Sequence, residues 1–264
     1  MGRPIALTPT CVNLLLMTAT FSENTAPPRM AAIDAARGGA VYTMALYHLV
    51  WDLNIFKFTS FALFTDPFWL GVRTVIVSAF LFLAGLSLVL ADRRGRGWLA
   101  FGRRVIIVAF GAALVSFGTW VIFPTNYVFF GVLHCIVISS LIVFPFLRCP
   151  ARVAFLVGLA ILVVPAFLSH SIFDHPWLQW VGLVTQMPQS VDYVPFFPWT
   201  GMIVLGVAYG LWRGERPAGT FSDWQPGNAL SICTVWLGQH SLVVYILHQP
   251  ILIFFVWLAA ELIR

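Results

Sequence analysis

The chain has few charged residues: 15 Lys and Arg and 10 Asp and Glu together make up only 9% of its 264 residues. A soluble domain carries about 25% charged residues, so the composition excludes an ordinary soluble fold. The hydrophobic share is 60% and the mean hydropathy is +0.89. The basic residues are spread over short loops without interleaved aromatic residues, which argues against nucleic-acid binding. We therefore expect an all-α, polytopic helical membrane protein.

The chain is also poor in cysteine, with four residues that form no CxxC pair and follow no regular spacing (Cys11, Cys135, Cys149 and Cys233). Isolated cysteines in apolar segments usually pack as small hydrophobic side chains. The sequence therefore predicts no disulfide and no metal held by cysteine. It contains no internal repeat, no low-complexity tract and no soluble domain.

Two parts of the chain differ in organisation. We expect residues 1–28 to be a dispensable N-terminal extension that ends at a pair of prolines. We expect residues 29–264 to form a single transmembrane domain. A bilayer is crossed by about 20 apolar residues in a helix. This length predicts seven spans, at residues 37–57, 68–91, 102–123, 126–147, 152–170, 195–213 and 235–261. A short apolar run at 176–184 is an eighth, interfacial or re-entrant element, because it is too brief to span.

Arginines gather in the loops on one side of these spans. Cytoplasmic loops are enriched in Lys and Arg, so this side is predicted to be cytoplasmic, with the N-terminus inside. Seven spans then place the C-terminus outside. The basic residues that mark this side are Arg3, Arg29, Arg37, Arg93, Arg94, Arg96, Arg103, Arg104, Arg148, Arg152, Arg213 and Arg216.

A polar stripe interrupts the first apolar segment. At about 100° per residue, Arg37 and His48 fall within roughly 20° of each other, and Asp34 and Asp52 lie within roughly 60° of Arg37. A charge at the bilayer centre costs about 2.5–3.5 kcal/mol or more unless it finds a partner or water, so such a stripe indicates a functional site. Asp52 lies one turn after His48, where it is expected to orient the imidazole as a general base.

The depth of each residue predicts partners for the stripe. Asp52 and Arg73 each lie about five residues from the outer end of a predicted span, so we expect them to be paired or bridged. The alternative is an ion pair that pins two helices without any chemistry.

Other polar residues are predicted to reach the same layer. His134 and His248 lie inside later spans, where a catalytic role and a hydrogen bond between helices are both open. Pro250 removes a backbone donor, so either a kink opens space there for a substrate or Gln249 fills the gap. Asp192 lies at the outer mouth of the sixth span, where it is expected to line an entrance. The alternative is that this segment with its prolines only starts the helix.

Five segments occur in an order that resembles a known family. They are RMAAIDAARGGAVYTMALYHLVWDL (29–53), FLFLAGLSLVL (80–90), GVLHCI (131–136), DYVPFFPWTG (192–201) and LGQHSLVVYILHQP (237–250). The series resembles the membrane acetyltransferases that include the catalytic domain of heparan-α-glucosaminide N-acetyltransferase. It is more distantly similar to the bacterial transmembrane O-acyltransferases of cell-envelope sugars. In those relatives a basic residue is followed, after ten residues, by a histidine, as Arg37 is followed here by His48.

The resemblance implies a transferase with a site inside the membrane. It implies cytosolic acetyl-CoA as co-substrate, a saccharide amine or hydroxyl on the outer side as acceptor, and no metal or haem. Membrane lipid is the other expected partner, and a homodimer is open. By this resemblance His48 acts with Asp52, and the site is lined by Arg37, Arg73, His134, Asp192, His248 and Gln249. The CoA phosphates are expected to meet Arg93, Arg94, Arg96, Arg103 and Arg104. The alternative is that these arginines only mark the cytoplasmic side. The expected location is the bacterial inner membrane.

The chain also departs from the lysosomal enzyme. That enzyme has more helices, a lumenal domain and an active histidine after its first helix, whereas residues 57–66 contain no histidine here. Two other functions stay open on the residues alone. One is a transporter or flippase that uses the stripe as a proton or substrate path. The other is a haem or metal protein that uses His48, His134 and His248.

Overall fold

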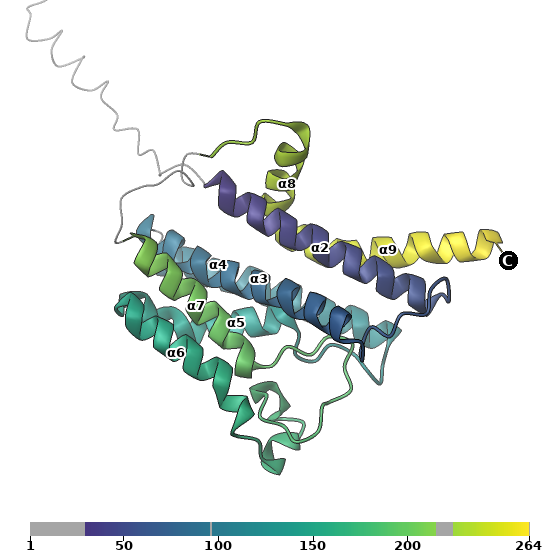
Figure 1. The fold of residues 1–264 in the computed structure, drawn as a ribbon, viewed down its shortest axis with the longest axis horizontal. Helices are drawn as coiled ribbons and strands as arrows, with labels where there is room; N and C mark the ends of the chain where they lie inside the picture. The colour runs from purple at the N-terminus through teal and green to yellow at the C-terminus, as the bar shows by residue number, and fades with distance from the viewer. Residues whose placement is uncertain (1–29, 96, 215–223, 264) are drawn as a thin grey trace, which may run out of the picture.

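The structure is a computed structural model that describes residues 30–95, 97–214 and 224–263. Within these ranges every regular element is a helix, as predicted (Figure 1). The predicted extension at residues 1–28 lies outside the described residues. The long helices are α2 (Ala31–Ile55), α3 (Pro67–Arg93), α4 (Trp98–Ile122), α7 (Phe196–Gly214) and α9 (Ser241–Ile263). The shorter α-helices are α5 (Val132–Val143), α6 (Ala151–Val163) and α8 (Ala229–Gln239).

The described part of the chain also contains four short 3-10 helices. The first two, η1 (Phe144–Arg148) and η2 (Val164–Ala166), extend α5 and α6, and the others, η3 (Ser171–Asp174) and η4 (Gln179–Val181), lie in the loop before α7. The run at 176–184 therefore holds a single 3-10 turn. Among the residues that the structure describes, the helices α3, α4 and α9 are long and apolar enough to cross a membrane. The seven predicted spans remain a prediction.

Local sequence explains several helix ends. Asp66 caps α3, because its carboxylate accepts a hydrogen bond from the Phe68 amide at 2.8 Å and Pro67 fits the first helical position. Asn228 and Ser231 form a reciprocal cap at the start of α8. The predicted span at 235–261 is divided, because α8 ends and α9 begins on either side of His240.

The helices pack in two groups that meet along α2 and α3. In Figure 1, α2 runs beside α9, and α8 lies across the start of α2. The second group is centred on α7, which packs between α3 and α6 and also contacts α5. The largest buried cluster lies in this second group and includes Leu81, Val89, Ile203 and Val207.

Glycines allow the helix backbones to approach closely. On α2 and α8, a Cβ at Gly38 would meet the carbonyl of Thr234, and a Cβ at Gly238 would meet the carbonyl of Asp34. On α3 and α7, Gly85 and Gly206 are in the same position against the backbone of the facing helix. Membrane helices associate through such small residues because apolar side chains gain little by leaving lipid.

The two adjacent glycines of α2 provide a matched test of this packing. We expect Gly38→Ala to lower the free energy of unfolding by about 1–3 kcal/mol, because the added methyl group must push α8 away. Gly39→Ala should leave stability unchanged or slightly higher, since a Cβ there meets nothing within 4 Å. Thermal unfolding in detergent checks both variants. Equal melting temperatures for the two would contradict the close α2–α8 contact.

Candidate functional site

Two histidines from opposite ends of the chain meet inside the helix bundle. His48 comes from α2 and His248 from α9, and the His48 Nδ1 atom lies 2.6 Å from the His248 Nε2 atom. The imidazole rings stack with centroids 4.8 Å apart and an angle of 28° between their planes. The structure thus brings together two of the histidines that the sequence placed at one depth.

The backbone of α9 fixes the protons of this pair. The His248 Nδ1 atom lies 2.6 Å from the carbonyl oxygen of Tyr245. A carbonyl only accepts, so Nδ1 must donate, and in a neutral imidazole Nε2 is then an acceptor. The His48 Nδ1 atom therefore donates to His248, which leaves a lone pair on the His48 Nε2 atom. This is the protonation state that a general base requires.

Asp52 has different partners from those the sequence predicted. It is fully buried, and its Oδ1 atom accepts a hydrogen bond from the Gln249 Nε2 atom at 2.8 Å. Its Oδ2 atom has no hydrogen-bond partner among the described residues. The expectation that Asp52 orients His48 is therefore wrong at the level of direct contact, because His48 binds the neighbouring histidine on α9 instead.

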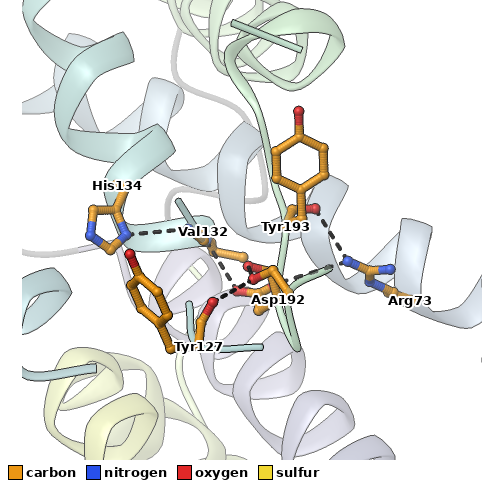
Figure 2. Close-up of polar contacts among 8 residues, drawn as sticks. Arg73, Tyr127, Val132, His134, Asp192 and Tyr193 are labelled. Carbon is orange, nitrogen blue, oxygen red and sulfur yellow. Dashed lines mark hydrogen bonds and ion pairs between the residues drawn. The ribbon is translucent and has the colours of Figure 1, made fainter. Parts of the chain in front are cut away.

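Arg73 is held by the loop before α7 (Figure 2). Its Nη2 atom lies 3.8 Å from the Asp192 Oδ1 atom and donates to the carbonyl of Tyr193 at 3.2 Å. The predicted pairing of Arg73 with Asp52 is thus also wrong: equal depth does not place two side chains on facing sides of their helices. Asp192 in turn accepts from the Val132 amide at the start of α5, at 3.3 Å.

The Asp192 carboxyl lies outside the helices and is half-buried. Burial raises its pKa, and the nearby Arg73 guanidinium and the Val132 amide oppose that shift. The carboxyl links the wall of the site to the start of α5.

His134 is engaged in local structure instead of the histidine pair. Its Nδ1 atom accepts from the Gly131 amide at 3.2 Å, so it caps α5 (Figure 2). Its Nε2 atom lies 3.2 Å from the Ser116 Oγ atom, which itself donates to the carbonyl of Val128. One ring nitrogen therefore caps α5, and the other joins α5 to Ser116 of α4. Within the described ranges, no three His, Cys, Asp or Glu side chains gather as a metal site.

A cavity of about 380 Å³, here called the histidine cavity, lies beside the pair. It is bounded by the later half of α2, the early half of α3, the later half of α4 and the middle of α9. Its polar lining is His48, Arg73, Asp192, His248 and Gln249, and most of the remaining wall is apolar or aromatic. The residues predicted to line the site are thus gathered here, apart from Arg37 and His134.

A second cavity of about 580 Å³, the arginine cavity, lies toward the other end of the same helices. Arg37, Arg94 and Arg104 line it. Arg37 is fixed by Asp34 at 2.8 Å and by the Ser87 hydroxyl at 2.6 Å. Both volumes lie in the range of small-molecule sites.

The other predicted CoA-binding arginines are placed differently. Arg93 donates to the carbonyl of Leu211 on α7 at 3.2 Å and is not part of the cavity wall. Arg103 is likewise absent from the wall, although it adjoins Arg104 in the chain. Arg96 lies outside the described residues.

The two cavities share one wall, which is formed by Phe80, Val132 and Tyr245. None of these three residues was singled out from the sequence. One signal was available for Tyr245: it lies three residues before His248 and so on the same face of α9. The two cavities thus meet next to the histidine pair, and together they extend along the helices from one end of the bundle toward the other.

Comparison with known proteins identifies a family to which this chain is similar in sequence. The family model for heparan-alpha-glucosaminide N-acetyltransferase, catalytic, matches residues 29–250, well over half of the chain. No curated protein and no solved structure matches the chain. The matched range contains both histidines of the pair and every residue of the shared wall. This chain is an integral membrane protein and belongs to the heparan-alpha-glucosaminide N-acetyltransferase catalytic family.

Proposed function

We propose that this protein transfers an acetyl group from acetyl-CoA in the arginine cavity to a saccharide amine or hydroxyl in the histidine cavity. The observation that supports this most is the pair of cavities that share a wall beside His48. The CoA side faces the cytoplasm and the acceptor side faces outward, across the inner membrane of a bacterium. If the protein forms a homodimer, each chain still contains its own site, because the residues that line both cavities come from one chain.

The arginine cavity suits the anionic part of the donor. CoA carries several phosphate charges, and guanidinium groups bind phosphate through paired N–H donors. Arg94, the residue that follows α3, and Arg104 of α4 supply such groups. Arg37 adds a third that is held in place by Asp34 and Ser87.

His48 carries out the proton transfers. Its free Nε2 lone pair removes a proton from the acceptor amine or hydroxyl as the acceptor attacks the acetyl carbon. The C–S bond of the thioester then breaks, the CoA thiolate leaves, and His48 returns the proton to sulfur. The products are the acetylated acceptor and CoA, and His48 is neutral again.

The same lone pair also serves a two-step route. The His48 Nε2 atom would attack the thioester first, so that the C–S bond breaks, the CoA thiolate leaves and an acetyl-imidazolium forms. The acceptor then attacks the acetyl carbon, His48 leaves as neutral imidazole, and the acceptor proton passes to the CoA thiolate. Labelled acetyl groups that stay on the purified protein when no acceptor is added distinguish this route from direct transfer.

Loss of the His48 imidazole tests the central role of this residue. We expect His48→Ala to lower the rate of acetyl transfer by about 100-fold or more, since it removes the general base. The matched control is His240→Ala, whose ring is exposed and bonded to the carbonyl of Trp236 outside both cavities. The assay follows labelled acetyl-CoA in proteoliposomes, together with mass spectrometry of envelope glycans from cells with and without the protein. Full activity in His48→Ala would contradict the mechanism, and movement of a substrate without consumption of acetyl-CoA would favour a transporter.

The proton arrangement in the pair gives a second prediction. We expect His248→Ala to lower the rate because the His48 Nδ1 atom loses its acceptor and the ring loses its orientation. His248→Gln keeps a side-chain oxygen that can accept this bond, so it should retain more activity than the alanine variant. Rates in the same assay, with protein yield and melting temperature as controls, check the order. Equal loss in both variants would show that the hydrogen bond is not what matters.

The arginine cavity gives a third prediction. We expect Arg94→Gln and Arg104→Gln to raise the KM for acetyl-CoA with a smaller effect on kcat, because they remove phosphate contacts made before and during the reaction. Arg152→Gln is the control, since Arg152 is exposed at the start of α6 and lies outside the cavity wall. An unchanged KM in both cavity variants would place CoA elsewhere.

A further inference from the structure

Tyr245 occupies the boundary between the two cavities. It is half-buried on α9, and its side chain forms part of the wall of both the arginine cavity and the histidine cavity. Its ring meets Phe80 of α3 edge to face, with centroids 6.1 Å apart and an angle of 81° between their planes. These two rings therefore form part of the wall between the two cavities.

The Tyr245 hydroxyl has no hydrogen-bond partner among the described residues. A tyrosine hydroxyl inside a protein usually finds one, and Tyr193 follows that pattern, since its hydroxyl donates to the carbonyl of Gln179 at 2.6 Å. The free donor of Tyr245 is thus available to a molecule that lies between the cavities.

The backbone carbonyl and the ring of Tyr245 both lie next to His248, the partner of His48. The Tyr245 carbonyl accepts the hydrogen bond that sets the protons of His248, and the centroid of the Tyr245 ring lies 5.9 Å from that of His248. One turn of α9 therefore holds a hydrogen-bond donor and the partner of the general base in a fixed relation. In acyl transfer, a base and a donor to the carbonyl oxygen must act at one carbon atom.

We propose that Tyr245 is a catalytic residue, whose hydroxyl donates a hydrogen bond to the acetyl carbonyl oxygen when the thioester reaches the shared wall. This role rests on the proposed function. When the acceptor attacks, the carbonyl π electrons move to oxygen, and the Tyr245 hydroxyl stabilises the resulting negative charge without giving up its proton. When the C–S bond breaks, the electrons return to the carbonyl and the CoA thiolate takes the proton that His48 holds.

The substitution Tyr245→Phe removes the hydroxyl and leaves the ring that separates the cavities. Loss of one donor to an oxyanion typically lowers kcat by 10²–10³-fold, so we expect a fall of about 100-fold with little change in the KM for acetyl-CoA. Tyr127→Phe makes the same chemical change outside both cavities and is expected to keep the wild-type rate. The probe is labelled acetyl-CoA with methyl α-D-glucosaminide as acceptor, using the full chain in liposomes.

A second variant series separates the hydroxyl from the packing of the ring. Replacement of Tyr245 by fluorinated tyrosines keeps the ring and makes the hydroxyl a stronger acid, so the rate should change in a graded way with fluorine content while the melting temperature stays constant. A wild-type rate in Tyr245→Phe and in the fluorinated series would overturn the role of Tyr245 and leave the proposed transfer intact. No acetyl transfer and no binding of acetyl-CoA by the wild-type protein would instead overturn the proposed function, and with it this inference.

Discussion

A single hydrogen bond between His48 and His248 organises the candidate site. It joins α2, near the start of the described chain, to α9, near its end, and its direction is set by the Tyr245 carbonyl. Because each proton in this series has one acceptor, the lone pair that faces the reaction is on the His48 Nε2 atom. The activity proposed for the protein depends on that lone pair and on its place beside the wall that the two cavities share.

The packing of the bundle keeps this bond in place. Gly38 and Gly238 bring α2 and α8 together, and α9 follows α8 directly, so the close contact also places His248 opposite His48. A second hydrogen bond, which the Gln249 side chain donates to the Asp52 carboxylate, joins the same two helices. Two polar contacts thus join α9 to α2 and the glycine contacts join α8 to α2, while α3 packs separately against α7.

Part of this could be predicted from the sequence. Apolar length predicted most helices, and the shared face of Arg37 and His48 predicted a polar path along α2, where each of the two residues lines one of the cavities. Depth along a helix could be estimated from residue number, and it placed His248 and Gln249 in the right layer. The direction in which each helix faces its neighbours could not be estimated from the sequence. For this reason the sequence wrongly predicted a pair of Asp52 and Arg73, whereas Asp52 binds Gln249 and Arg73 binds Asp192. The same limit applies to His134, which caps its own helix, and to Arg93, which turns toward α7.

The depth of the site residues along their helices could therefore be predicted from the sequence, whereas their contacts depend on the tertiary arrangement. The shared wall of Phe80, Val132 and Tyr245 comes from three helices and follows from no local pattern, yet in the proposed mechanism it separates the acetyl donor from the acceptor.

The most direct measurement is transfer across a sealed bilayer, with methyl α-D-glucosaminide trapped inside liposomes and labelled acetyl-CoA added outside. We expect labelled product inside the liposomes with wild-type protein and none with His48→Ala. Product that forms only when acceptor and acetyl-CoA share one side of the membrane would contradict it.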